Sequence, residues 1–370
     1  MFQDFNVIDS DGHTLEPPDL YERYLDKRFV HRVQQGPRGL LVDGQETASH
    51  PPGTLETLRF TPDLILERYG RLAAEGFTAA GVVEALDVEG IDVSVIYGPL
   101  YPCWIEGMDP ELACGLARAY SRWLAEYSAD SGGRIVGAAP IPLHSVDGAL
   151  AELAYASEDL GIRAVWTRPN PVRGKPLGSA EFEPFFEALA DRDMPLSLHE
   201  GSGSMMQNIG SERFTGTWFE QHACVHPMEQ QMAMLSLIVQ GVFERHPTLR
   251  VAFLESGSAW LPSWLHRLDE HAELVAWKDA PYLRLKPSDY FRQSCFISCD
   301  PDEDLVYQVV ETIGDDRIVF ATDFPHPDAK YPNAVKSFME LPRLTKDTRR
   351  KILWDNALAF YGSAIERGSA

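Results

Sequence analysis

The sequence lacks the features that mark membrane and secreted proteins. No stretch approaches the run of about 20 apolar residues that a membrane-spanning helix needs. Residues 1–7 contain neither the basic segment nor the apolar segment of a signal peptide. We therefore expect a cytoplasmic protein without a membrane partner.

Positive charge and cysteine are also scarce. The chain has 33 Lys and Arg residues against 55 Asp and Glu residues, which gives a formal net charge of -22. Binding to nucleic acid depends on basic side chains that displace counterions from phosphates, so we expect no nucleic-acid partner. The five cysteines are an odd number without paired metal spacing, which indicates reduced thiols.

The sequence does contain a regular alternation of short apolar runs and amphipathic segments. Each run has the length of a buried strand and is followed by helical periodicity. This alternation is typical of a parallel sheet wrapped by helices, and eight strands favour closure into a barrel. We therefore predict an α/β protein with the (β/α)8 TIM-barrel fold. The predicted strands span residues 6–9, 93–97, 134–138, 164–167, 195–199, 250–254, 294–298 and 317–321.

Two long segments interrupt this alternation. Residues 14–89 are too many for a simple connection between two strands, which predicts a cap-like insertion over the barrel mouth. Residues 200–226 form a second long loop on the same side, and Pro227 is expected to begin the next helix. The length of 370 residues suits one barrel with insertions, so a single domain over residues 1–370 is predicted.

Polar residues gather at the carboxyl ends of the predicted strands, where such barrels carry their functional groups. Asp11 and His13 follow strand one with one residue between them, so their side chains would point to the same side of an extended chain. His199 ends strand five, and Asp323 follows strand eight. Alone, Asp11 could cap a turn, His199 could be an interior residue and Asp323 could cap a helix. Together they predict a site for one divalent metal ion, because carboxylates and imidazoles crowded on one rim need a cation.

This pattern resembles the amidohydrolase superfamily, specifically the amidohydrolase-2 branch that includes aminocarboxymuconate semialdehyde decarboxylase and related nonoxidative decarboxylases. The resemblance covers nearly the whole chain. The segment IDSDGHTLEPPDLYERYL is similar to that branch's first strand, whose His-x-His or Glu-x-His pair binds metal, and here Asp11 and His13 hold these positions. The resemblance also implies that His199 is the ligand from strand five and Asp323 the ligand from strand eight.

The chain departs from this branch at two strand ends. The decarboxylases usually carry a His at the end of strand six, where this chain has Glu255 within FLESG. Binuclear relatives tend to carry a bridging lysine at the end of strand four, where this chain reads WTRPN. The first departure favours hydrolysis over decarboxylation, and the second favours a single metal ion.

The expected function is that of a metal-dependent hydrolase that acts on a small cyclic or aromatic molecule through a metal-activated water. One alternative is a nonoxidative decarboxylase of an aromatic or dienoic acid, which the closeness of the branch suggests. Another is a catalytically silent barrel used for binding. His and carboxylate ligands suit zinc, manganese or iron, and we expect zinc. The resemblance also implies a homo-oligomer, either a dimer or a tetramer.

Three residues are predicted to be catalytic. Asp323 would take or deliver a proton as well as bind the metal. Glu255 would be a fifth ligand or a second base, and His222 would orient substrate or move protons.

Other residues are predicted to bind substrate. Arg168, at the end of strand four, would pair with a substrate carboxylate, and a salt bridge to a neighbouring loop is the alternative. His226 and His326 would orient the substrate, although positions on a loop surface or at a helix start explain them equally well. An aromatic pocket, for which core packing is the alternative, would be lined by Tyr97, Tyr101, Trp104, Met205, Met206 and Trp218.

Overall fold

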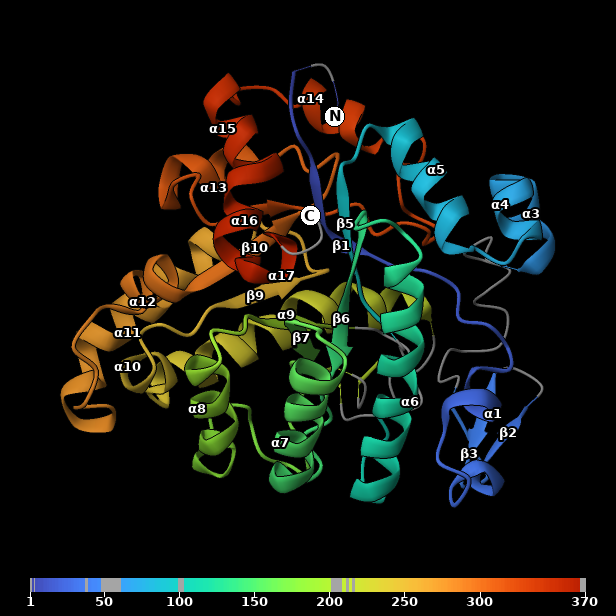
Figure 1. Ribbon diagram of the computed structural model, residues 1–370. Coiled ribbons are helices and arrows are strands. Elements are labelled where there is room, and N and C mark those ends of the chain that lie inside the picture. The colour runs from blue at the N-terminus through green and yellow to red at the C-terminus, as the bar shows by residue number, and fades with distance from the viewer. Residues whose placement is uncertain are drawn as a thin grey trace.

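The barrel predicted from the sequence is present in the computed structural model, which describes residues 2, 4–36, 39–47, 61–98, 103–200, 208–210, 213–214 and 217–366. At its centre, eight parallel strands pair in the order in which they occur along the chain (Figure 1). Every residue of the second strand, the fourth strand and the fifth strand is buried, which explains why they read as continuous apolar runs. The strands are β1 (Ile8–Gly12), β5 (Val93–Ile96), β6 (Ile135–Pro140), β7 (Ala164–Thr167), β8 (Leu196–His199), β9 (Val251–Leu254), β10 (Cys295–Cys299) and β11 (Ile318–Phe320).

Contacts between the segments at the ends of β1 and β11 close the barrel. Gly12 forms a parallel bridge with Phe324. The backbone N–H of Asp323 donates to the carbonyl oxygen of Asp11 at 2.8 Å. The residues that follow the first and last strands therefore lie side by side at the mouth, although more than three hundred positions separate them in the sequence.

A buried carboxylate reinforces this closure. Asp9 of β1 accepts hydrogen bonds from the backbone N–H of Thr322 at 2.9 Å and from the Ser94 hydroxyl at 2.8 Å. Nearby, a Cβ at Gly12 would lie 2.4 Å from Ser94 Oγ, so this position has no room for a side chain. Asp9 thus ties β1 to β5 and to the segment that follows β11.

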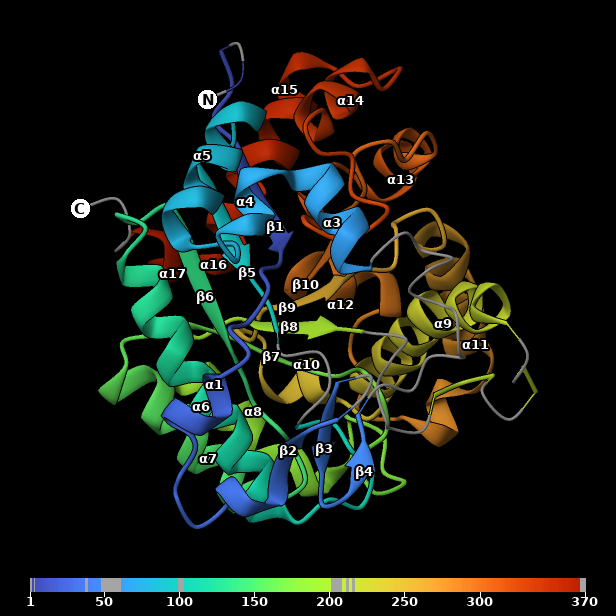
Figure 2. The same ribbon diagram turned by 90° about the vertical axis from the view of Figure 1, so that its right-hand side faces the viewer.

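Helices surround the strands on the outside of the barrel (Figures 1 and 2). The local sequence explains where they begin: for example, the Asp109 side chain accepts a hydrogen bond from the N–H of Glu111, and Pro110 occupies the first helical position. The helices between the barrel strands are α5 (Ala79–Glu89), α6 (Pro110–Ala129), α7 (Val146–Ala154), η2 (Tyr155–Asp159), η3 (Ala180–Phe182), α8 (Glu183–Asp191), α9 (Trp218–Val239), α10 (Val242–Arg245), α11 (Leu261–Asp279), α12 (Pro287–Ser294) and α13 (Val306–Ile313). Those after β11 are α14 (Ala334–Glu340), α15 (Lys346–Arg350), η4 (Lys351–Asp355), α16 (Asn356–Tyr361) and α17 (Ser363–Glu366).

The described parts of the segment between β1 and α5 lie on the mouth side of the barrel. Arg32 pairs with Asp109 at the start of α6, and the Tyr69 hydroxyl donates to Pro325 O at 2.9 Å. Both partners belong to connections that follow barrel strands, which is where a barrel of this type opens. The elements of this segment are α1 (Leu20–Tyr24), η1 (Val30–Arg32), the small antiparallel sheet β2 (Val33–Gln35), β3 (Leu40–Val42) and β4 (Gln45–Glu46), α3 (Pro62–Tyr69) and α4 (Arg71–Ala74).

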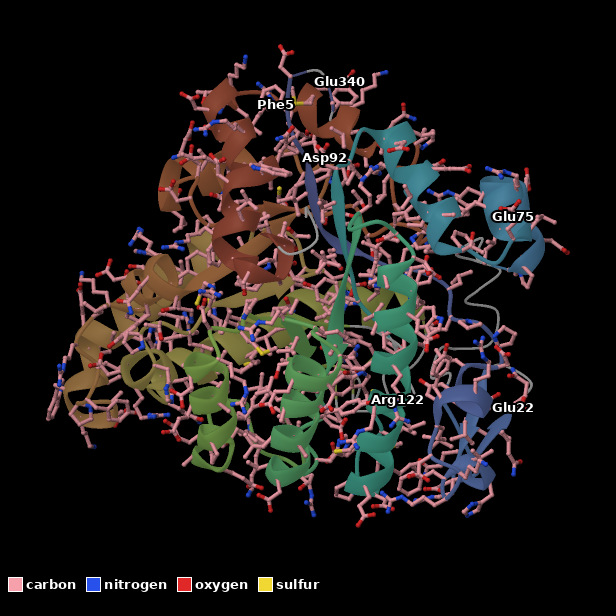
Figure 3. The ribbon with its side chains drawn as sticks, in the orientation of Figure 1. Phe5, Glu22, Glu75, Asp92, Arg122 and Glu340 are labelled. Carbon is pink, nitrogen blue, oxygen red and sulfur yellow. The ribbon has the colours of Figure 1, made fainter. Side chains whose placement is uncertain are left out.

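Charged side chains cover the outer helices. Figure 3 shows Glu22, Glu75 and Glu340 on the outside of the molecule, and all three are exposed. Within the described ranges, no helix combines the length and the apolar character that crossing a bilayer requires.

The prediction for the loop after β8 was wrong in part. Pro227 does not begin a helix, because α9 already begins at Trp218 and Pro227 lies inside it. The Thr217 side chain accepts a hydrogen bond from the N–H of Glu220 at 3.2 Å, and this N-terminal cap allows the earlier start. His222 and His226 are therefore helical residues. Much of the preceding loop, residues 201–207, 211–212 and 215–216, lies outside the described residues.

Candidate functional site

The polar residues predicted at the strand ends meet at the mouth of the barrel. Asp11 lies in β1 and His13 directly after it, while His199 is the last residue of β8. Glu255 follows β9 and Asp323 lies shortly after β11. Because the carboxyl ends of all barrel strands open at the same end of the cylinder, residues from distant parts of the sequence form one cluster.

The distances in this cluster match those of a coordination shell. His199 Nε2 lies 2.9 Å from Asp11 Oδ1, and His13 Nε2 lies 3.5 Å from the same oxygen. His13 Nε2 also lies 3.0 Å from Asp323 Oδ1. Ligands that bind a divalent ion at about 2.0 to 2.2 Å lie roughly 2.9 to 3.5 Å from one another. Asp11, His13 and His199 could therefore hold one ion. Asp323, the fourth predicted ligand, is not part of this group and contacts it through His13.

A second, overlapping group contains a residue that was not predicted as a ligand. His13, Asp323 and His326 have possible ligand atoms within 4.8 Å of one another. The ring of His326 stacks on that of His13 with a centroid separation of 4.2 Å, and His326 Nδ1 lies 2.8 Å from Asp323 Oδ1. His326 thus lies beside the cluster, in a position suited to contact either an ion or a substrate.

Several buried polar atoms of the cluster make no hydrogen bond with the described residues. A buried polar atom without a partner costs free energy, so each such atom calls for an explanation. These atoms are Asp11 Oδ2, His13 Nε2, His199 Nδ1, Glu255 Oε2 and Asp323 Oδ1. Two of them lie close to each other, since His13 Nε2 and Asp323 Oδ1 are 3.0 Å apart. A bound cation would satisfy oxygen and nitrogen lone pairs of this kind, so the donor set fits a divalent metal ion.

The surroundings of the two predicted histidine ligands suit metal binding. His13 Nδ1 lies 3.2 Å from the backbone carbonyl oxygen of Tyr97, to which it donates, and this leaves the lone pair on Nε2. Burial, together with the neighbouring His13, holds the pKa of His199 well below its ordinary value. Metal binding requires the neutral form of the imidazole.

The carboxylates crowd one another. Burial raises the pKa of Asp11 to about 7, and burial together with the charges of Asp323 and Asp11 raises the pKa of Glu255 well above its ordinary value. Burial would also raise the pKa of Asp323, but the neighbouring His326 and His13 outweigh it and lower that pKa. Burial opposes protonation of His326, yet the Asp323 carboxylate raises the pKa of His326 to about 9. The Asp323 carboxylate therefore favours the protonated form of His326.

Exposure divides the cluster into an inner set and an outer set. The side chains of Asp11, His13 and His199 are 1%, 4% and 0% exposed. Those of Asp323, His326 and Glu255 are 22%, 17% and 14% exposed. The inner set can hold an ion but is closed to a larger molecule, whereas a substrate at the mouth can reach the outer set.

Strained backbone marks two of the outer residues. Glu255 and Asp323 have φ values of 52° and 55°, in the left-handed region that residues with a Cβ rarely adopt. Such conformations persist when the surroundings impose them, and they are concentrated at functional sites.

The predicted substrate-binding residues are mostly covered. Arg168 is fully buried and pairs with Glu200 at 2.7 Å, which corresponds to the salt-bridge alternative. Trp104 is buried and packs against Trp166 with a centroid separation of 5.1 Å, which corresponds to the core-packing alternative. Both side chains are buried, and Arg168 lies close enough to Glu255 to lower its pKa, so their role in binding substrate stays a prediction.

His222 and His226 lie on one face of α9. Their rings are 4.3 Å apart, and the ring of Trp218 stacks on His222 at 4.0 Å. The buried His226 donates from Nδ1 to the backbone oxygen of Glu255 at 2.8 Å, so it supports the backbone at Glu255. Of the residues predicted to line an aromatic pocket, Tyr101, Met205 and Met206 lie outside the described residues.

Sequence reasoning did not identify two residues that shape the site. Asp9 was seen only as part of the strand end, and Glu200 was not weighed as the partner of Arg168. The second could have been found, because the two residues follow neighbouring strands of a parallel sheet. The hydrogen bonds of Asp9 join β1 to β5 and to the segment after β11, and no local pattern in the sequence indicates them.

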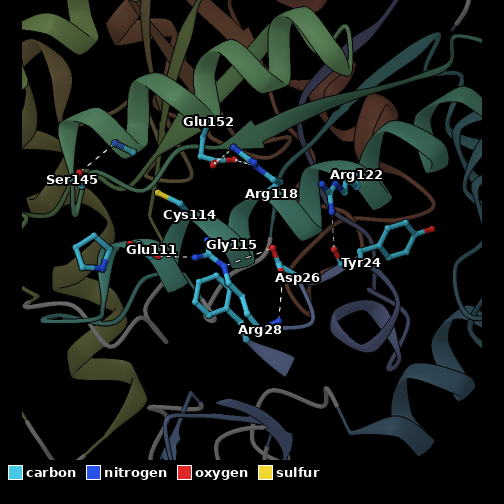
Figure 4. Close-up of a pocket in the computed structure, with 13 residues that line it drawn as sticks. Tyr24, Asp26, Arg28, Glu111, Cys114, Gly115, Arg118, Arg122, Ser145 and Glu152 are labelled. Atoms are coloured by element: carbon cyan, nitrogen blue, oxygen red, sulfur yellow. Dashed lines mark hydrogen bonds and ion pairs between the residues drawn. The ribbon is translucent and has the colours of Figure 1, made fainter. Parts of the chain in front are cut away.

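A cavity of about 280 Å³ lies elsewhere, on the outside of the barrel between α1, α6 and α7 (Figure 4). Its charged side chains satisfy one another: Arg118 forms two hydrogen bonds with Glu152, at 3.0 and 2.7 Å, and Arg28 pairs with Glu111 at 2.9 Å. Among the described residues that line it, no buried side-chain polar atom is left without a partner. We therefore regard the mouth, and not this cavity, as the candidate functional site.

Comparison with known proteins identifies the family. The sequence model of the amidohydrolase family matches residues 105–363, which is well over half of the chain. The chain belongs to the amidohydrolase family. Membership confirms the resemblance that the strand-end motifs indicated.

Two relatives of the chain are decarboxylases. The chain is 23% identical over 284 residues to a 2-amino-3-carboxymuconate-6-semialdehyde decarboxylase of Dictyostelium discoideum, and the match covers 76% of this chain and 75% of that protein. It is 25% identical over 288 residues to a gamma-resorcylate decarboxylase of Polaromonas sp., with 74% of this chain and 84% of that protein covered.

Solved structures share the fold over the full length. An amidohydrolase from Mycobacterium avium subsp. paratuberculosis superposes with a TM-score of 0.77 at 25% identity and covers 97% of this chain and 100% of its own. The 5-carboxyvanillate decarboxylase of Novosphingobium aromaticivorans, solved with manganese and 4-hydroxy-3-methoxy-5-nitrobenzoic acid, superposes with a TM-score of 0.72 at 20% identity and covers 97% of each chain.

Proposed function

We propose that this amidohydrolase is a metal-dependent, nonoxidative decarboxylase of an aromatic carboxylic acid. The observation that carries the proposal is the inner set, Asp11, His13 and His199. These residues are buried, and their possible ligand atoms lie within 4.8 Å of one another. Asp11 Oδ2 and His199 Nδ1 make no hydrogen bond with the described residues. The activities of the related decarboxylases support this reaction over the hydrolysis expected from the sequence.

In this proposal Asp11, His13, His199 and Asp323 hold one divalent ion. When bound, the ion would neutralise the carboxylates and provide a Lewis acid for an oxygen of the substrate. The donor set suits zinc, manganese or iron. Manganese is present in two of the solved decarboxylases, so we place it before the zinc that was expected from the sequence.

The outer set supplies the proton chemistry. The carbon–carbon bond to the substrate carboxylate breaks, the electron pair stays on the ring carbon, and a proton takes the place of carbon dioxide. Glu255 and Asp323 are the carboxyl groups of the cluster that a substrate can reach. Burial raises the pKa of Glu255, whereas the pKa of Asp323 is lowered, so we assign the proton donor to Glu255. His326, which is also accessible and contacts Asp323, orients the substrate.

An isotope experiment tests this reaction. Protein loaded with Mn²⁺ is incubated in D₂O with 2,6-dihydroxybenzoate or 5-carboxyvanillate as probes. The proposal predicts equal amounts of carbon dioxide and arene, with one deuterium at the carbon that carried the carboxylate. If the Asp323→Asn variant still released carbon dioxide, a contaminating enzyme would be the source of that carbon dioxide.

Hydrolysis remains the second candidate because of Glu255. This carboxylate lies 3.2 Å from His199 Nδ1, at the strand end where the decarboxylases of the branch usually have a histidine. A carboxylate there suits the activation of water. If a panel of aromatic acids released no carbon dioxide while an aryl lactone or amide incorporated ¹⁸O from water, hydrolysis would replace decarboxylation as the proposed reaction.

A further inference from the structure

Tyr97, which follows β5, contacts both predicted histidine ligands. Its backbone oxygen accepts the hydrogen bond from His13 Nδ1, at 3.2 Å. Its ring stacks on the imidazole of His199, with a centroid separation of 5.1 Å and an angle of 22° between the planes. Tyr97 is 1% exposed, so packing fixes its ring, and any shift of Tyr97 would move the surroundings of both histidines.

The hydroxyl of Tyr97 belongs to a buried chain of hydrogen bonds. Tyr97 Oη lies 2.8 Å from Ser197 Oγ and 2.7 Å from Tyr361 Oη. Tyr361 Oη donates to the backbone oxygen of Ser10 at 3.0 Å. A hydroxyl carries one proton, so the direction of the chain follows. Because Tyr361 donates its only hydroxyl proton to Ser10, it must accept the hydrogen bond from Tyr97. Tyr97 in turn accepts from Ser197.

These hydrogen bonds connect Tyr97 to the strands that carry the predicted inner ligands. Ser197 lies two positions before His199 in β8, and side chains two apart share one face of a strand. Ser10 directly precedes Asp11 in β1. Tyr361 is the last residue of α16, near the C-terminal end of the described chain, so a helix outside the strands is tied to the segments on either side of the site.

We propose that Tyr97 and Tyr361 are positioning residues for the metal ligands, and that α16 thereby sets the geometry of the site from beneath it. The inference rests on the proposed metal site. Removing the Tyr361 hydroxyl leaves the Tyr97 proton without its acceptor and the Ser10 carbonyl without its donor. The orientation of Tyr97, and with it the two imidazoles, is then less well fixed. Partners outside the ligand set commonly change metal affinity by about 10-fold to 100-fold.

Metal affinity tests this inference without reliance on turnover. Calorimetric titration of Mn²⁺ into metal-free full-length protein should show a dissociation constant raised about 10-fold in Tyr361→Phe and in Tyr97→Phe. Ser197→Ala should raise it in the same direction. If Tyr97→Phe does not fold, the Tyr361 and Ser197 variants carry the test. A positioning role also predicts that excess Mn²⁺ restores the turnover of Tyr361→Phe.

The matched control is Tyr290→Phe. Tyr290 is as buried as Tyr97, and its hydroxyl accepts hydrogen bonds from the N–H groups of Arg284 and Leu285, at 3.0 and 3.3 Å, on α12 and the loop before it. This variant should lower the melting temperature but leave the Mn²⁺ dissociation constant unchanged.

The outcomes separate the inference from the proposed function. If wild-type protein binds Mn²⁺ and releases carbon dioxide while Tyr361→Phe and Ser197→Ala keep wild-type affinity within twofold, the positioning role is overturned and the function stands. If wild-type protein binds no divalent ion, both are overturned. If it binds Mn²⁺ without decarboxylating any aromatic acid, weaker binding in these variants still supports the positioning role.

Discussion

The barrel mouth and the outer cavity between α1, α6 and α7 both gather charged side chains, but they satisfy them differently. In the outer cavity, Arg118 and Glu152 pair in two hydrogen bonds, and Arg28 pairs with Glu111. At the mouth, carboxylates and imidazoles meet, and buried polar atoms of Asp11 and His199 lack hydrogen bonds within the described chain. The comparison teaches that unpaired buried groups, more than the presence of charge, distinguish a binding site from a structural cluster.

The largest effect should follow from loss of an inner ligand. His199→Ala removes a donor that is fully buried, so metal affinity should collapse and turnover should fall at least about 1000-fold. Metal content by plasma mass spectrometry and turnover measured on the same samples check this. A His199→Ala protein that retained its metal and most of its activity would place the site elsewhere.

A smaller effect is expected at Glu255 in the outer set. Glu255→Gln keeps the shape but cannot exchange a proton, so turnover should fall about 100-fold while metal content is unchanged. Glu270→Gln, at an exposed position of α11, is the matched control and should behave as wild type. Equal activity of the two variants would assign the proton to Asp323.

Metal removal should lower stability. Because the ion binds the folded chain, Mn²⁺ at 100 times its dissociation constant should add about 2.7 kcal/mol to the free energy of unfolding. Thermal unfolding with and without chelator measures this, and the His199→Ala variant should show no shift. Equal shifts in both proteins would mean that the ion binds outside the inner set.

The smallest effect on activity is expected in the outer cavity. Glu152→Gln weakens the pair with Arg118 and should lower the free energy of unfolding by about 1 to 3 kcal/mol, while turnover stays within twofold. Denaturant titration and the carbon dioxide assay measure the two effects. A loss of turnover larger than the loss of folded protein would contradict the purely structural role assigned to this cavity.

The sequence predicted the barrel because its strands are buried on both faces. Runs such as residues 93–97 and 164–167 therefore stand out as continuous apolar segments, and they coincide with β5 and β7. The convergence of Asp11, His13, His199 and Asp323 could also be predicted, since it follows from the rule that strand ends of a barrel meet at one rim. That these residues bind metal is still a prediction.

Contacts that join distant elements could not be predicted. The bond between Tyr97 and Tyr361 spans 264 positions, and nothing near either residue indicates the other. The prediction that Pro227 begins a helix was wrong, because Thr217 caps α9 and the helix already begins at Trp218. A tertiary contact joins the two tyrosines, and a side-chain cap sets the start of α9. A pattern of apolar residues indicates neither of them.

A crystal structure of the Mn²⁺-loaded protein, with anomalous diffraction recorded at the manganese edge, tests the central claim most directly. We predict one strong anomalous peak within about 2.4 Å of His13 Nε2, of a nitrogen of His199 and of carboxylate oxygens of Asp11 and Asp323. The absence of a peak at the mouth of a protein crystallised in saturating Mn²⁺, or a peak bound by other residues, would contradict the account.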